Sequence, residues 1–156
     1  MTTSDRKGIA SEASEKLAWA EGEIRRLMDL NQSIFEALDM LGLGVVLVDG
    51  EHIMYATQGF LAICGYTLDE FMAVPSFYDV IPVEIRAAFR TRMAKRLRGE
   101  EVDSHYPVTM LHKDGHPIEL DVAISLATVD GRPQVVAIVR PDPAYQAEIR
   151  AVIRGI

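Results

Sequence analysis

The sequence predicts an α+β fold: a five-stranded antiparallel sheet with helices on one face, flanked by a long N-terminal helix and a C-terminal helix. Three features of the 156-residue chain predict it. Apolar residues recur at heptad spacing near the N-terminus, two strand-like segments precede a helical region, and three strand-like segments follow it. Strands joined by tight turns pair antiparallel, and helices grouped between them cover one face of the sheet.

The N-terminal part is predicted to form a dimer. Residues 1–10 are small and polar and are expected to be disordered. Residues 11–41 are expected to be an amphipathic coiled-coil helix, because apolar residues recur at alternating intervals of three and four. The one polar residue in this pattern, Asn31, occupies an a position, where a buried Asn fixes register and oligomeric state. The predicted dimer interface, called here the heptad face, consists of Leu17, Ala20, Ile24, Leu27, Asn31, Ile34, Leu38 and Leu41.

The predicted core, residues 42–140, opens with a strand pair. Residues 45–49 are almost wholly apolar, and a second strand over residues 52–56 follows an Asp-Gly turn, a strong hairpin signal. Two short helices are then expected. Thr57 is suited to cap the first helix, and residues 67–70 match the capping box that opens the second.

The third and longest helix of the core is predicted over residues 83–98. Its remaining positions carry Arg and Lys, which are expected to form a solvated outer face paired with Asp and Glu. This helix should bury an apolar stripe at i, i+4 spacing, formed by Ile85, Phe89, Met93 and Leu97.

Three strands and a final helix complete the prediction. Strands are expected over residues 102–111, 116–127 and 134–140, joined by Lys-Asp-Gly and Asp-Gly turns. The middle strand alternates apolar and polar residues, which is typical of a sheet with one buried face. Residues 141–156 carry an apolar stripe at helical spacing and are predicted to be a C-terminal amphipathic helix that needs a partner.

Three segments of the core together resemble the PAS domain family, over about residues 34–140. They are the first strand with its Asp-Gly turn, the Cys-Gly-Tyr-Thr-Leu-Asp-Glu-Phe segment at 64–71, and the His-Lys-Asp-Gly turn at 112–115. Two positions depart from the family pattern. Thr57 stands where many members have Asn, and Arg-Pro-Asp-Pro at 140–143 replaces the usual Asp-Ile/Val-Thr exit.

The resemblance implies a sensory and dimerisation module. Domains of this family can hold a small ligand between the helices and the inner face of the sheet. Their flanking helices carry a change in the core to an effector such as a histidine kinase or a cyclic-nucleotide enzyme. The heptad pattern at the N-terminus fits that use independently of the resemblance.

An apolar pocket between the helices and the sheet is the candidate ligand site, with a fully packed core as the alternative. The residues expected to line it are Met54, Phe71, Phe77, Phe89, Met93, Met110 and Ile124. A flavin adduct is disfavoured because Cys64 does not lie in an Asn-Cys-Arg-Phe-Leu-Gln motif, which flavin-binding PAS light sensors carry. We expect Cys64 to be a buried, small apolar residue. Haem is disfavoured because the long third helix contains no His. The cofactor is therefore unknown, and a small apolar ligand remains the candidate.

Other site chemistry finds little support in the sequence. His112 and His116 flank a turn and are expected to be solvated, so no metal site is predicted. Glu119 and Asp121 lie two residues apart on one strand, where exposure on the outer face is favoured over a catalytic pair.

No P-loop, nucleophile elbow or zinc-protease motif occurs, so we expect no enzymatic activity. A net charge of -7 disfavours binding to nucleic acid or an anionic membrane.

The first functional hypothesis is a cytoplasmic, homodimeric PAS-type sensor or interaction module. A single cysteine favours a reducing compartment, the first residues contain no apolar segment of a secretion signal, and no apolar run approaches the length of a membrane span. One alternative is a photoreceptor or redox sensor that binds a small molecule or cofactor. The other is a dimerisation domain without a ligand.

Overall fold

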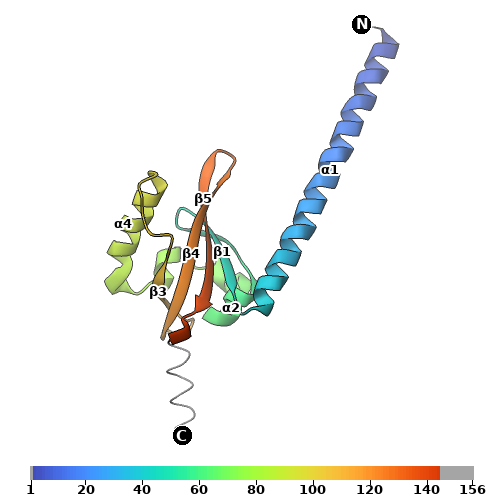
Figure 1. Ribbon diagram of the computed structural model, residues 1–156. Coiled ribbons are helices and arrows are strands. Elements are labelled where there is room, and N and C mark those ends of the chain that lie inside the picture. The colour runs from blue at the N-terminus through green and yellow to red at the C-terminus, as the bar shows by residue number, and fades with distance from the viewer. Residues whose placement is uncertain (1, 145–156) are drawn as a thin grey trace. The chain divides into compact units, whose positions relative to one another are not determined.

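The computed structural model describes residues 2–144, and it divides into two units, Met1–Ala37 and Leu38–Ile156. A single long helix, α1, runs over Thr3–Met40 (Figure 1). It begins earlier than predicted and includes most of the segment that was expected to be disordered. Most of the predicted C-terminal helix falls after residue 144 and lies outside the described residues.

The start of α1 has a local cause that the sequence analysis missed. The hydroxyl of Thr2 accepts a hydrogen bond from the backbone N–H of Asp5 at 3.2 Å, and the Asp5 carboxylate accepts one from the N–H of Thr2 at 2.9 Å. This reciprocal pair satisfies two backbone donors that the first turn of a helix leaves without intrahelical partners. The carboxylate also accepts a hydrogen bond from the Thr2 hydroxyl, which lowers the pKa of Asp5.

The second unit is built on a five-stranded antiparallel sheet with the spatial order β2-β1-β5-β4-β3 (Figure 1). The predicted α+β fold with this sheet is therefore confirmed. The last three strands form a meander, and the final strand returns to pair with the first. The strands are β1 Gly44–Asp49, β2 His52–Ala56, β3 His105–Leu111, β4 Pro117–Val129 and β5 Arg132–Pro141.

The helices of this unit lie between β2 and β3 in the chain. The predicted helix over residues 83–98 is split, because its first turn is a 3₁₀ helix and the α-helical part begins at Arg86. The elements are α2 Gln58–Cys64, α3 Leu68–Met72, η1 Phe77–Val80, η2 Val83–Ile85 and α4 Arg86–Leu97.

Both predicted helix caps are present. Thr67 and Glu70 form a complete capping box at the start of α3. Thr57 caps α2 and also joins it to β1, since its hydroxyl accepts a hydrogen bond from the N–H of Val45 at 2.9 Å. The backbone N–H of Thr57 donates in return to the Val45 carbonyl, also at 2.9 Å. A fully buried hydroxyl thus fixes the entry of α2 onto the sheet.

One face of the sheet forms the core. Along β4, Leu120, Val122 and Ile124 are buried while the residues between them are more exposed, which confirms the predicted alternation. The buried residues of the helices join the same cluster. Gly44 permits this close packing, because a Cβ atom there would lie 2.5 Å from the Cα of Phe60 in α2.

No helix among residues 2–144 combines the length and the apolar composition that crossing a bilayer requires.

Candidate functional site

A small apolar cavity lies between the inner face of the sheet and the helices. Its volume is about 40 Å³. Its wall is formed by aromatic and Met side chains of η1 and α4 on one side and by aliphatic residues of β1, β3, β4 and β5 on the other. A space of this size holds a few non-hydrogen atoms, since one water needs roughly 10–15 Å³ on the same measure. A flavin or a haem fits only if the surrounding side chains rearrange.

The predicted lining residues divide into two groups. Phe77, Phe89, Met93, Met110 and Ile124 line the cavity. Met54 does not line it and is 45% exposed, because it is the extra residue of a bulge where the β1–β2 register shifts. Phe71 is fully buried but does not line the cavity either. Its ring lies 5.2 Å from that of Phe60, which does reach the cavity, so Phe71 packs behind Phe60.

Sequence reasoning missed the contribution of the sheet to the cavity wall. Val46 and Val48 of β1 and Val135, Ala137 and Val139 of β5 all line it. Each set alternates along its strand, and the registers bring the two strands together at the centre of the sheet. Both strands are apolar nearly throughout in the sequence, so the pairing of β1 with β5 was needed to place these residues on one wall.

The helical wall is ordered by aromatic contacts. The ring of Phe89 lies 6.1 Å from that of Phe77 and 5.9 Å from that of Tyr78, which meets it edge-on. The guanidinium of Arg90 lies 4.0 Å from the centre of the Tyr78 ring and also binds Glu51 at 2.7 Å. Burial raises the pKa of Tyr78, so its hydroxyl stays protonated at neutral pH.

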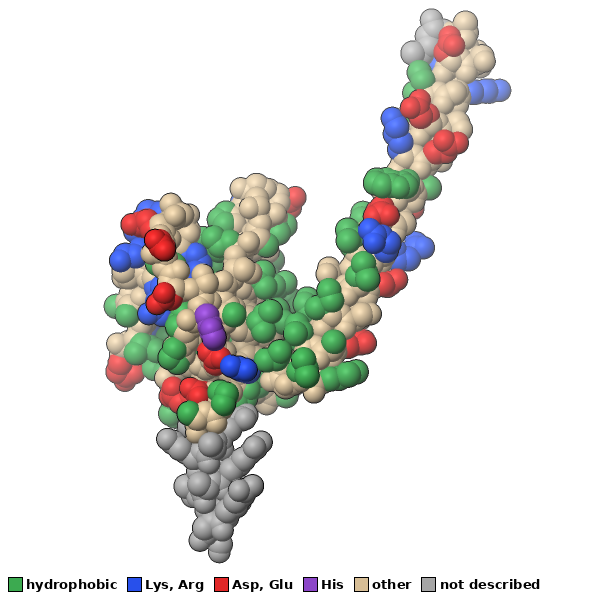
Figure 2. Space-filling model, in the orientation of Figure 1, with side chains coloured by type: hydrophobic (Ala, Val, Ile, Leu, Met, Phe, Trp, Pro, Cys, Tyr) green, Lys and Arg blue, Asp and Glu red, His purple; other side chains and the backbone are tan. Residues whose placement is uncertain are grey.

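The basic residues of α4 are mostly exposed to solvent, as predicted, but one of them is buried. Figure 2 shows Lys and Arg gathered with Asp and Glu over this part of the molecule. Arg98 binds Glu100 at 2.6 Å, as the predicted pairing implies. Arg96, however, is buried, and its Nη2 donates to the carbonyl oxygen of Asp103 at 2.6 Å. The segment before β3 covers this arginine, which the helical pattern alone did not indicate.

The two carboxylates of β4 bind different partners on the outer face. Asp121 accepts hydrogen bonds from His105 at 2.8 Å and Arg140 at 3.0 Å. The bond from His105 is the main reason that the pKa of Asp121 is lowered. Glu119 instead accepts a bond from the Thr109 hydroxyl at 2.9 Å. Each carboxylate is thus held by its own neighbours on adjacent strands.

Cys64 is fully buried at the end of α2, as predicted. Its Sγ donates to the carbonyl oxygen of Leu61 at 3.7 Å. Burial raises the pKa of the thiol, which keeps it neutral and weakly reactive at physiological pH.

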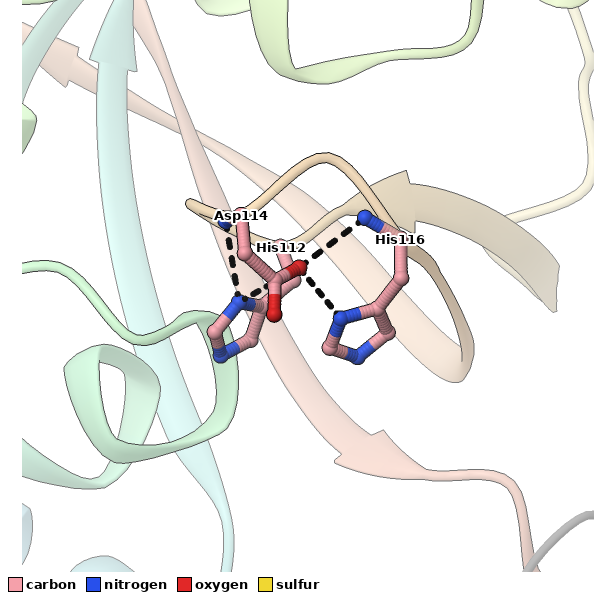
Figure 3. A group of neighbouring side chains, drawn as sticks. All are labelled: His112, Asp114 and His116. Atoms are coloured by element: carbon pink, nitrogen blue, oxygen red, sulfur yellow. Dashed lines mark hydrogen bonds and ion pairs between the residues drawn. The ribbon is translucent and has the colours of Figure 1, made fainter.

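A second group of polar residues lies on the β3–β4 turn. His112, Asp114 and His116 place potential metal ligands within 4.8 Å of one another, and among residues 2–144 they form the one such group (Figure 3). His112 Nδ1 lies 3.2 Å from Asp114 Oδ1, and His116 Nδ1 contacts the same oxygen. From the sequence, both histidines were expected to be solvated and no metal site was predicted. The His-x-Asp-x-His spacing around a Gly turn was the signal available.

Comparison with known proteins identifies the fold. No family model and no curated protein matches the sequence. The PAS domain of a protein from Desulfitobacterium hafniense is 19% identical over 67% of this chain and 97% of its own, with a TM-score of 0.58. A domain of a sensory box sensor histidine kinase/response regulator from Geobacter sulfurreducens is 20% identical over 72% and 96%, with a TM-score of 0.55.

The chain has the PAS fold. A third structure, from a study of a flavin analogue in a light-oxygen-voltage domain, is 20% identical over 80% of this chain and 96% of its own, with a TM-score of 0.56. The resemblance drawn from the three motifs is therefore confirmed at the level of fold.

The two departures from the PAS pattern have structural explanations. In this PAS core, the hydroxyl of Thr57 makes the connection between β1 and α2 described above. At the other end, β5 continues to Pro141, and the N–H of Asp142 donates to the carbonyl oxygen of Glu119 at 3.0 Å. The Arg-Pro-Asp-Pro segment at 140–143 is thus hydrogen-bonded to β4 through the backbone of Asp142.

Proposed function

We propose that the chain is a PAS-type sensory and homodimerisation module of cytoplasmic signal transduction. A change in the PAS core alters how two copies of α1 pair, and an effector such as a histidine kinase or a cyclic-nucleotide enzyme responds. Support for a sensory role comes from the fold, because a similar domain belongs to a sensor histidine kinase. The single cysteine, Cys64, suits the reducing environment of the cytoplasm.

The observation that carries the proposal is the exposure of the heptad face in the single chain. The exposed fractions are 61% for Leu17, 59% for Ile24, 51% for Leu27 and 54% for Ile34. Figure 2 shows hydrophobic side chains recurring along this helix among charged ones. Aliphatic side chains at a and d positions favour packing against a second helix, and a second copy of α1 presents the matching face.

Asn31 gives the pairing a defined register. Its amide lies at an a position between Leu27 and Ile34, both of which are exposed in the single chain. In a parallel, in-register dimer the two Asn31 side chains face each other and can hydrogen-bond across the interface. In other registers each amide is buried against aliphatic residues, which is costly. We therefore propose a parallel homodimer.

The apolar cavity supplies the input in this proposal. Met93 and Met110 line it, and Met side chains adapt to ligands of different shape. A small apolar molecule that binds one conformation of the core more tightly shifts the population of the core toward that conformation. The ligand can shift the equilibrium of the helix pair by no more than the difference between its binding free energies for the two conformations of the core.

Native mass spectrometry of the purified protein tests the proposal and separates the alternatives. The proposal predicts a homodimer, and a small apolar ligand appears as a mass difference on gentle ionisation. An absorption spectrum of the same sample shows whether a flavin or haem is retained. A retained chromophore would favour the photoreceptor or redox sensor, and a dimer that never binds a small molecule would favour the plain dimerisation domain. A monomer would contradict both the proposal and the plain dimerisation domain.

A further inference from the structure

We infer that the β3–β4 turn is a binding site for a divalent transition-metal ion of the Zn²⁺ class, held by His112, Asp114 and His116. Figure 3 shows the Asp114 carboxylate next to the Nδ1 atoms of both imidazoles, which point to the same side of the turn. Two imidazole nitrogens and one carboxylate oxygen form a donor set typical of catalytic and exchangeable zinc sites. Hard cations such as Mg²⁺ prefer oxygen ligands alone.

The distances between the donors suit such an ion. Metal–nitrogen and metal–oxygen bonds of about 2.0–2.2 Å place two ligands of a tetrahedral ion about 3.3 Å apart. His112 Nδ1 and Asp114 Oδ1 are 3.2 Å apart. His116 is exposed and can rotate to complete the triangle, and water can occupy the fourth position.

Both rings direct Nδ1 toward the Asp114 carboxylate. His112 Nδ1 accepts a weak hydrogen bond from the backbone N–H of Asp114 at 3.2 Å, so this nitrogen already presents a lone pair. His116 Nδ1 contacts Oδ1 of the same carboxylate. A metal ion bound at Nδ1 of His116 requires the tautomer of this ring that carries its proton on Nε2.

The turn that carries the ligands is held in place by its backbone and by α2. The N–H of His112 donates to the carbonyl oxygen of His116 at 2.9 Å, and the N–H of Lys113 donates to that of Cys64, also at 2.9 Å. The ring of His112 lies against Gly65, where a Cβ atom would come within 2.3 Å of its Nε2. The three ligands therefore sit on a preformed turn, which reduces the ordering that metal binding requires.

The nearby charges leave the site accessible to a cation. The ammonium of Lys113, the nearest cation in sequence, is bound to Glu70. The Asp114 carboxylate accepts a hydrogen bond from the backbone N–H of His116 at 3.0 Å, which holds its Oδ1 near both rings.

Titration calorimetry with Zn²⁺ on the full chain without a histidine tag tests the inference. We expect one Zn²⁺ per chain, no comparable binding of Mg²⁺, and a rise in melting temperature of roughly 5–10 °C when Zn²⁺ is one hundred times its dissociation constant. His116→Gln and Asp114→Asn should each weaken binding by at least about tenfold. Both residues are exposed, so neither change should unfold the protein.

His52→Gln is the matched control, because His52 is an exposed histidine on a different strand. It should bind Zn²⁺ like the unchanged chain. The inference is overturned if the unchanged chain shows no saturable Zn²⁺ binding or if His116→Gln binds as tightly as His52→Gln. One Zn²⁺ per two chains would also overturn it, because the ion would then join two molecules.

Discussion

The substitution Leu27→Glu tests whether the heptad face is the dimer interface. Leu27 occupies a d position, and its side chain is 51% exposed in the single chain. Full burial of a Leu side chain stabilises by about 1.5–3 kcal/mol, so burying the remaining half contributes about 1 kcal/mol per chain and about 2 kcal/mol per dimer. The substitution also places two carboxylates opposite each other in an apolar interface, which costs several kcal/mol more.

A total loss of about 4 kcal/mol or more raises the dissociation constant of the dimer by roughly 1,000-fold. Sedimentation velocity over a dilution series measures this change, and circular dichroism shows whether the PAS core remains folded. Ser33→Glu is the matched control, because it introduces the same side chain at an exposed position of α1 outside the heptad face. The reasoning is refuted if Leu27→Glu dissociates no more readily than Ser33→Glu.

Three further predictions concern the PAS core. Thr57→Val should destabilise the protein by about 1–3 kcal/mol in urea denaturation, because the N–H of Val45 loses its buried acceptor, and an equal stability would show that the hydroxyl is dispensable. Gly65→Ala should destabilise more than Gly115→Ala. Both glycines have positive φ (81° and 94°), which costs other residues about 1–2 kcal/mol, but only at position 65 would the new Cβ meet a neighbour, the His112 ring. The Lys113 ammonium, followed by the hydrogen bonds from Thr67, lowers the pKa of Glu70 from 4.5 to about 2. The stability that Glu70 contributes is therefore present above pH 4.5 and is lost as pH falls toward 2. Melting curves of Glu70→Gln should lack this part of the acid dependence, and an unchanged dependence would contradict the assignment.

Features set by local chemistry could be predicted from the sequence. The caps at Thr57 and Thr67 and the Asp-Gly turns depend on residues a few positions apart, so their side chains specify the backbone directly. The same kind of signal, Thr2 followed by Asp5, was present at the start of α1 but was not used.

Features set by contacts between distant segments could not be predicted from the sequence. Met54 faces away from the cavity because a bulge in the β1–β2 pair shifts its register, and nothing in the composition of either strand marks that shift. Arg96 is buried, and its guanidinium donates to the carbonyl oxygen of Asp103 on the segment that precedes β3. The cavity wall likewise depends on the pairing of β1 with β5, which are separated by most of the PAS core.

The coupling between cavity and helix pair is the central claim, and disulfide formation between two copies tests it most directly. In a parallel dimer, Ile34→Cys places two thiols opposite each other, whereas Ser33→Cys does not. The rate at which Ile34→Cys forms a covalent dimer is then compared with and without Ala137→Val, which fills part of the cavity. The matched substitution Ala123→Val lies on the exposed outer face of the sheet. We predict that Ala137→Val changes the rate and Ala123→Val does not; equal rates in all three proteins would contradict the account.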